Sequence, residues 1–165
     1  FPAVGVTWQE CVNFTKQASL KWGKNVRLPT EAQWECALRA GTRTLFFWGD
    51  DYRLCGNYAW VRSSKQPYLH EVGLLKPNPW GLYDMVGNVR EWVLDRCEIA
   101  NDSPDVAPNH YPKVAKDWYC ANGSLAINRS GSFNSSDFSA ASHFNKVVSP
   151  DLRSEEVGFR IVVED

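Results

Sequence analysis

The first part of the chain carries apolar residues at helical spacing among polar ones. The apolar positions are Trp8, Cys11, Val12, Phe14, Ala18 and Trp22. Thr7 and Glu10 form a capping box at the start of this stretch. In a capping box the threonine hydroxyl accepts a hydrogen bond from the amide at position 10, and the glutamate side chain accepts one from the amide at position 7. Gly23 offers the left-handed conformation that ends a helix. The pattern predicts an amphipathic helix between Thr7 and Gly23.

A second stretch repeats this arrangement. Thr30 and Gln33 form another capping box, directly after a proline. The buried stripe that follows consists of Trp34, Ala37 and Leu38. Gly41 comes shortly after the last apolar position, so the sequence predicts a short second helix that ends before it.

Helical periodicity disappears after Gly41, where prolines and glycines recur and favour turns and short strands. Strand-like apolar runs lie at 91–94, 125–127 and 157–163. Polar loops are expected at 99–113 and 134–155. The predicted class is α+β, with two N-terminal helices, short antiparallel strands and a high loop content.

Length and composition restrict the classes of protein that are possible. The chain has 165 residues, which suits a single domain, 1–165. Its net charge of −1 argues against a nucleic-acid partner, which requires a concentrated positive surface. No apolar run approaches the length of a membrane span, and no secretory leader pattern opens the chain. The compartment stays unassigned, with a cytoplasmic protein or an exported effector favoured. Because the sequence opens at Phe1 without a methionine, we expect it to be part of a longer protein.

The cysteines show no pattern of a metal or redox motif. They lie at positions 11, 36, 55, 97 and 120, with no Cys-x-x-Cys pair among them. Cys11 and Cys36 fall within the helical patterns, where we expect them to be buried as small apolar residues. Cys97 and Cys120 bracket a polar stretch, and the sequence leaves open whether they are bridged.

The chain is rich in aromatic residues, with eight tryptophans. Large aromatic side chains anchor loops that have no regular periodicity of their own. Four tryptophans lie on apolar faces and are expected in the core: Trp8, Trp22, Trp34 and Trp92. Three more lie in loops, where burial and ligand contact remain equally open: Trp60, Trp80 and Trp118.

Five blocks follow one another in a characteristic order. They are residues 2–8 (PAVGVTW), 27–35 (RLPTEAQWE), 81–92 (GLYDMVGNVREW), 129–133 (RSGSF) and 157–160 (VGFR). In this order they resemble the formylglycine-generating-enzyme-like domain, also called the sulfatase-modifying-factor domain. The resemblance spans nearly the whole chain and implies a fold related to C-type lectins. Because domains of this family usually begin further upstream, the chain resembles the C-terminal majority of one.

The resemblance also implies a place for the catalytic chemistry. Enzymes of the family bind copper through two cysteines after the block at 129–133 and oxidise a substrate cysteine. The family spacing puts these positions close to Ser135 and Ala140 here, and no cysteine follows Arg129. A hydroxyl and a methyl group cannot replace thiolate ligands for copper. The sequence therefore predicts that no copper is bound and that the domain is not an enzyme, although an attached upstream domain can be one.

A calcium site is a second feature that the resemblance implies, in the turn of the 81–92 block. Carried over by position, its ligands are Asp84, the carbonyls of Gly87 and Val89, and Glu91. Such an all-oxygen set suits Ca²⁺. Two interpretations stay open: calcium binding, or capping and ion pairing of the two acids without a metal. A second calcium site of the family, at Asn57 and Tyr58, lacks a matching acid.

The polar segment 134–156 is the strongest candidate for recognition, because binding residues concentrate on loops that a rigid scaffold supports. The predicted ligand face combines this segment with the loop tryptophans: Trp60, Trp80, Trp118, Phe133, Asn134, Phe138, His143 and Phe144. Its partner is expected to be a protein or a small molecule.

The leading functional hypothesis is a non-catalytic binding, sensor or recruitment module. Relatives occur as C-terminal domains of bacterial Ser/Thr protein kinases, so the resemblance makes such an attachment plausible. Two alternatives are a C-type-lectin-like receptor diversified by a retroelement, and an accessory domain of a sulfur-oxidising enzyme. The upstream sequence separates the hypotheses: kinase motifs favour the sensor, and three metal-binding histidines on a helical bundle favour the enzyme.

Overall fold

The chain begins with two helices whose first turns are both capped as the sequence predicts. The computed structural model describes residues 1–64, 66–98 and 121–164. Helix α1 spans Trp8–Trp22 and α2 spans Glu31–Arg39, and a complete capping box forms at Thr7 and at Thr30. Gly23 ends α1 in the left-handed conformation, whereas Ala40 takes that conformation after α2. The predicted existence and extent of both helices are confirmed.

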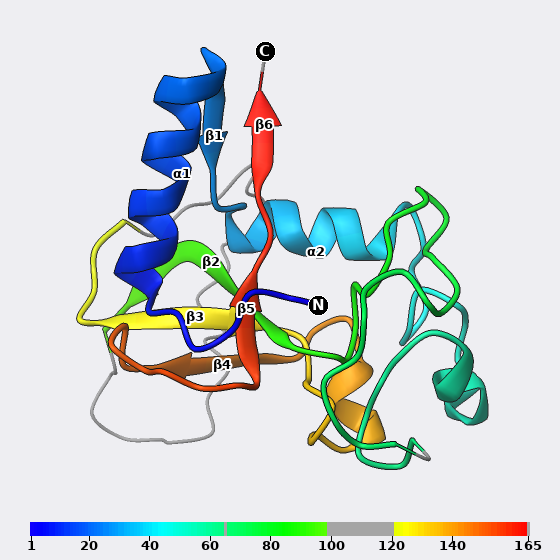
Figure 1. The fold of residues 1–165 in the computed structure, drawn as a ribbon. Helices are drawn as coiled ribbons and strands as arrows, with labels where there is room; N and C mark the ends of the chain where they lie inside the picture. Colours follow the sequence, from blue (N-terminus) through cyan, green and yellow to red (C-terminus); the bar gives the residue numbers. More distant parts are fainter. Residues whose placement is uncertain (65, 99–120, 165) are drawn as a thin grey trace.

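The remaining described elements are short, and much of the described chain between them is irregular (Figure 1). The strands are β1 (Asn25–Arg27), β2 (Arg90–Cys97), β3 (Leu125–Arg129), β4 (Asn145–Val148), β5 (Val157–Phe159) and β6 (Val162–Glu164). Two 3₁₀ helices, η1 (Tyr52–Asn57) and η2 (Asp137–Ala140), complete the list. The α+β class and the high loop content are confirmed.

The central sheet has the strand order β4-β3-β2-β5. Strands β2, β3 and β4 pair antiparallel, but β5 runs parallel to β2, with Glu91 opposite Gly158. The sequence predicts short antiparallel strands, and the β2–β5 pair at this edge is the exception. A parallel pair needs a long connection, and the chain between β2 and β5 supplies it.

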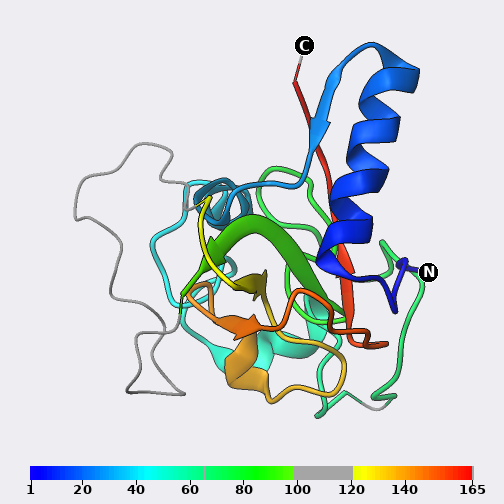
Figure 2. The same ribbon diagram turned by 90° about the vertical axis from the view of Figure 1, so that its left-hand side faces the viewer.

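The C-terminal apolar run at 157–163 is two strands, not one. It divides into β5 in the central sheet and β6, which pairs antiparallel with β1. Strands β1 and β6 stand beside α1, away from the central sheet (Figures 1 and 2). The segment predicted as a loop at 134–155 likewise contains η2 and β4. Strand pairing decides both features, and local apolar periodicity does not report it.

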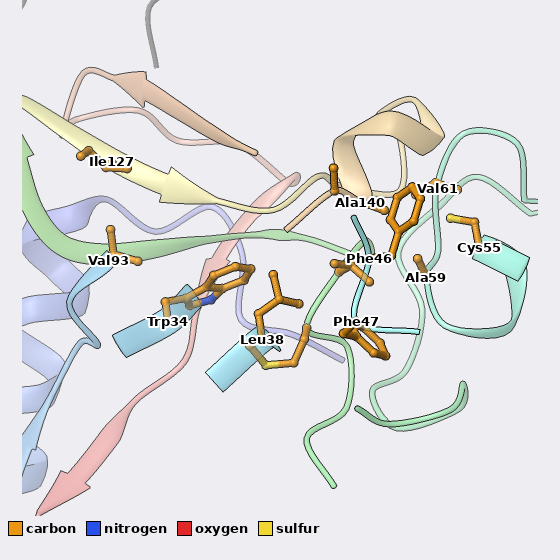
Figure 3. Packing of buried hydrophobic residues seen from close by; sticks show 13 residues of the cluster. Trp34, Leu38, Phe46, Phe47, Cys55, Ala59, Val61, Val93, Ile127 and Ala140 are labelled. Carbon is orange, nitrogen blue, oxygen red and sulfur yellow. The ribbon is translucent and has the colours of Figure 1, made fainter. Parts of the chain in front are cut away.

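Two apolar clusters lie on opposite faces of the central sheet. On one face, Trp92 and Ala126 pack with Trp8 and Cys11 of α1. On the other, Val93 and Ile127 belong to a larger cluster (Figure 3). Its buried members are Trp34, Leu38, Phe46, Phe47, Cys55, Ala59, Val61, Met85, Val86, Val93, Ile127, Ala140 and Ala141. Successive strand residues alternate between the two faces, so β2 and β3 serve both clusters.

Two residues expected in the core are exposed. Trp22 is 49% exposed, because the last turn of α1 extends past the central sheet (Figure 1). Cys36 is exposed because it lies two residues after Trp34, on the other side of α2. Trp8, Trp34, Trp92 and Cys11 are buried as predicted. Within the described residues, no helix has the length and apolar character that crossing a membrane would require.

Candidate functional site

A network of hydroxyl and carboxylate groups lies where the family resemblance implies the catalytic centre. The Ser132 Oγ donates to Glu156 Oε2 at 2.5 Å and lies 3.0 Å from the Ser135 Oγ. The Ser132 backbone N–H also donates to the Ser135 Oγ, at 2.9 Å. Both serines are buried, so their hydroxyls are engaged with protein groups.

Arg90 and Asn134 complete this network. The Arg90 guanidinium donates to Glu156 Oε2 at 3.0 Å and to Ser135 Oγ at 2.9 Å. The Asn134 amide donates to Glu156 Oε1 at 3.1 Å. Burial acts to raise the pKa of Glu156, but hydrogen bonds from Ser132 and Asn134, with the Arg90 charge, outweigh it and lower that pKa. The carboxylate is therefore held in its charged form by its neighbours.

The second position implied for a copper-binding cysteine belongs to the apolar core. Ala140, at the end of η2, is 1% exposed within the larger cluster. The segment is tightly packed, because a Cβ added at Gly131 would come within 2.7 Å of the Ser139 Cβ. Ala140 thus presents only a methyl group, and it presents it to other apolar side chains.

The described cysteines do not form a thiol pair near this network. Cys11 and Cys55 are buried in different clusters, and burial raises the pKa of each thiol to about 12. Cys36 is exposed on α2. The possible bridge of Cys97 involves Cys120, which lies outside the described residues. A raised pKa keeps the buried thiols protonated and unreactive.

The structure brings part of the predicted ligand face together. The Asn88 N–H donates to the Trp60 carbonyl at 2.8 Å, and the Phe133 N–H donates to the Asn88 carbonyl at 2.8 Å. Arg62 donates its backbone N–H to the Ser135 carbonyl and its Nε to the Asn134 carbonyl, each at 2.9 Å. The loop that carries Trp60 therefore lies beside the segment that carries Phe133 and Asn134.

Side-chain exposure within this group differs. Phe138 is 72% exposed on η2, next to Asp137, which accepts a hydrogen bond from Ser63. Trp60 is half-buried, with its ring centroid 3.7 Å from that of His70. Phe138 and Asn134 therefore present the accessible surface, and Trp60 supports it.

Other predicted members of the ligand face lie elsewhere or cannot be placed. Trp80 is exposed on a turn that Asn78 attaches to the end of α2, by hydrogen bonds to the carbonyls of Ala37 and Leu38. His143 is exposed and Phe144 is half-buried just before β4. Trp118 lies outside the described residues. No described contact joins Trp80 to the group around Phe133.

The turn predicted to hold calcium has an unusual backbone. Asp84, Gly87 and Asn88 have positive φ values of 52°, 73° and 58°. A Cβ at Gly87 would lie 2.4 Å from the Trp60 carbonyl oxygen, so glycine is required there. Asp84 lies at the start of this turn, and Glu91 follows it in β2.

The acids of this turn already have protein partners. Glu91 accepts from the Trp34 indole at 2.6 Å and from both the Nε and the Nη2 of Arg160, at 2.5 and 2.7 Å. Asp84 accepts from the Gly73 N–H at 2.7 Å. These contacts are the ones expected from the second interpretation of the sequence, in which the two acids cap the turn and form ion pairs without a metal.

The turn also has the chemistry of a cation site. Burial raises the pKa of Asp84, the Gly73 N–H and the Arg160 charge lower it, and the Glu91 charge raises it further. The Arg160 charge acts on the pKa of Asp84 more strongly than the Glu91 charge does, so this guanidinium already offsets the repulsion between the two carboxylates. Within the described residues no three His, Cys, Asp or Glu side chains gather at one point, so carbonyls would supply the other ligands. Oxygen ligands of this kind suit Ca²⁺ chemically, but both Glu91 oxygens are engaged by Trp34 or Arg160, so a bound ion would have to displace the Arg160 guanidinium.

The second family calcium position has a different occupant. The Asn57 carbonyl accepts from the Lys76 N–H at 2.9 Å. The Lys76 ammonium lies 5.9 Å from the centroid of the Tyr58 ring. The Lys76 side chain therefore lies beside Tyr58 at this position.

Sequence reasoning did not single out the residues that close the central network. Arg90 lies inside the 81–92 block, Ser132 inside the 129–133 block and Glu156 directly before the VGFR block. Their positions inside or beside recognisable blocks were the available signal. Their contacts span up to 66 positions of sequence separation, which no local pattern reports.

Comparison with known proteins assigns the family. A family model described as the sulfatase-modifying factor enzyme 1-like domain matches residues 1–165. The formylglycine-generating enzyme of Mus musculus is 29% identical over 175 residues, covering 99% of this chain and 44% of that enzyme. A serine/threonine-protein kinase of Chlamydia pneumoniae is 38% identical over 99 residues, covering 57% of this chain and 14% of the kinase.

A solved structure is similar over almost the same extent. Treponema denticola variable protein 1 superimposes with a TM-score of 0.82 at 28% identity, covering 97% of this chain and 70% of that one. The chain spans less than half the length of the mouse enzyme. With the family model matching from end to end, the chain belongs to the sulfatase-modifying factor enzyme 1-like family, whose enzymes generate formylglycine.

Proposed function

We propose that this domain is a non-catalytic binding module that retains the scaffold of the formylglycine-generating enzymes. The observation that carries the proposal is the Ser135 hydroxyl, bonded to Arg90 and Ser132 at a position where the family enzymes have a copper-binding cysteine. The other such position, Ala140, is packed in the core. Neither residue supplies a thiolate, and cuprous copper is selected by soft sulfur ligands.

The binding surface in this proposal is the group formed by Phe138, Asn134 and Phe133 on one segment and Arg62 on the neighbouring loop. Exposed phenylalanine, amide and guanidinium groups suit a protein partner, because aromatic and arginine side chains are enriched at recognition surfaces. Hydrogen bonds between the two segments hold the surface in a defined shape. Pre-organisation of this kind reduces the entropy lost on binding.

The similarity to a chlamydial Ser/Thr kinase supports a role in recruitment. A domain attached to a kinase gains function by bringing substrates or regulators to the catalytic domain, without chemistry of its own. Sequencing the region upstream of Phe1 tests this attachment. Kinase motifs there agree with it, and three metal-binding histidines on a helical bundle contradict it.

The non-catalytic half of the proposal is tested by an oxidation assay. The purified chain is incubated with copper, oxygen, a reductant and a cysteine-containing peptide, with a formylglycine-generating enzyme as the positive control. We expect no formylglycine in the peptide by mass spectrometry. Copper-dependent formation of that product by the chain would refute the proposal.

A diversified receptor is the second candidate, favoured by the structural similarity to Treponema denticola variable protein 1. The exposed residues Phe138 and His143 lie in the segment that would vary. This candidate requires a near-copy of the 3′ coding segment beside a reverse transcriptase gene. Without such a copy in the source genome it fails.

A further inference from the structure

A groove lies on the side of α1 that is not part of the candidate site. It has a volume of about 510 Å³ and opens between α1, β1 and β2. Its apolar lining comes from Val12 and Leu20 of α1, Val26 of β1 and Leu94 of β2. Leu20 is 79% exposed, so an apolar side chain at the rim faces solvent.

The edge of β1 that borders this groove is closed to strand pairing. The Ser19 hydroxyl accepts from the Val26 N–H at 2.8 Å and donates to the Val26 carbonyl at 2.9 Å. These are the backbone groups that an added strand would have to bond. A partner must therefore use side-chain contacts rather than extend the sheet.

Two cations line the groove, and within the described residues only one of them has an acidic partner. Lys16 and Arg27 line it, and Lys16 forms no ion pair with any described residue. Arg96, two residues after Leu94 on β2, lies over the Trp8 ring at 5.0 Å. Glu164 is the acid bonded at this edge, and Arg27 and Asn25 already engage it. The groove thus combines an apolar floor with an uncompensated cation at its rim.

We propose that this groove docks an acidic, leucine-rich segment of a partner protein. Apolar side chains of the segment would fill the space between Val12, Leu20 and Leu94, and a carboxylate would pair with Lys16. Charge complementarity selects the partner, since Lys16 would repel a basic segment, whereas the Arg27 charge is already paired with Glu164. The inference is independent of the proposed function, because it uses none of the residues near Ser135.

Fluorescence anisotropy with a labelled peptide of leucine and glutamate tests the proposal. The comparison peptide replaces every glutamate with lysine. We expect the acidic peptide to bind and to lose affinity as salt rises, and the basic peptide not to bind. Equal binding of both peptides, or binding of neither, would overturn the proposal.

Matched variants locate the contact. Lys16→Gln should weaken the affinity for the acidic peptide about twofold to fivefold, as expected for loss of one exposed charge pair. Lys21→Gln removes a charge from the same helix outside the groove and should leave affinity unchanged. Leu20→Asp should abolish binding, with circular dichroism verifying that the helix persists. An equal effect of the two lysine variants would show general attraction to the helix and refute docking in the groove.

Discussion

The Arg90 guanidinium donates a hydrogen bond to the Ser135 hydroxyl at 2.9 Å, at the place where the family resemblance implies a copper-binding cysteine. The same guanidinium pairs with Glu156, which Ser132 and Asn134 also contact. One polar network thus joins five side chains: Arg90, Ser132, Asn134, Ser135 and Glu156. These hydrogen bonds and the Arg90–Glu156 ion pair hold the loop after β3 against β2, although the Arg90 Nε is buried without a partner among the described residues.

Arg90→Gln should make the protein less stable and change the pH dependence of its stability. The pKa of Glu156 is lowered in the folded chain. The stabilisation that the Glu156 carboxylate gives is therefore fully present above the pKa of the unfolded chain, about 4.3. It is lost as the pH falls through the lower pKa of the folded chain. Breaking this partly buried pair should lower the free energy of unfolding at neutral pH by about 1–3 kcal/mol. Urea denaturation measures this change.

The acid limb of the stability curve provides the check on Arg90. In Arg90→Gln the fall in unfolding free energy below pH 5 should be shallower than in the wild type, because less of the Glu156 shift remains. Arg153→Gln, which removes an exposed pair with Glu10, should change neutral-pH stability much less. An unchanged acid limb in Arg90→Gln would contradict the network as described.

Calcium should bind at the turn between Asp84 and Glu91, one ion per chain. Because the Arg160 guanidinium already contacts Glu91, we expect weak affinity, on the order of 10⁻⁴–10⁻³ M. Calorimetry should give heat with the wild type and none with Glu91→Gln. Glu155→Gln, at an exposed acid outside the turn, should behave as the wild type. Identical heats from the wild type and Glu91→Gln would remove the site.

Gly87→Ala should destabilise the chain strongly, because two effects combine at this position. The residue has φ 73°, and its Cβ would meet the Trp60 carbonyl oxygen at 2.4 Å. Gly81→Ala is the matched control, with φ 78° and nothing within 4 Å of its Cβ. We expect a loss of about 1 kcal/mol for Gly81→Ala and about 3 kcal/mol or more for Gly87→Ala. Equal losses in unfolding free energy for the two variants would mean that the Trp60 backbone does not lie close to Gly87.

Asn128→Leu should stabilise the protein. Asn128 is 1% exposed, and neither polar atom of its side chain has a partner among the described residues. An isosteric apolar side chain removes that desolvation penalty, so the free energy of unfolding should rise by about 1–3 kcal/mol. Asn145→Leu should do the opposite, because Asn145 donates to Glu31 at 2.7 Å. Destabilisation by Asn128→Leu would indicate that a bound water or ligand satisfies the amide.

The sequence by itself determined the parts of this protein that depend on near neighbours. The capping boxes at Thr7 and Thr30 act over three residues, so their pattern predicted both helices. The family blocks indicated the fold, and the residue types at 135 and 140 were sufficient to exclude thiolate ligands there.

Only the tertiary structure decided which groups meet. It paired β5 parallel with β2, separated β6 into a second sheet and left Trp22 exposed where α1 passes beyond the sheet. It also placed Arg90 against Ser135 and Arg160 against Glu91, across 45 and 69 positions of sequence. Such contacts depend on how the sheet and loops pack in three dimensions. Local periodicity carries no information about packing between distant segments, which is why the sequence predicted the elements but not the network they enclose.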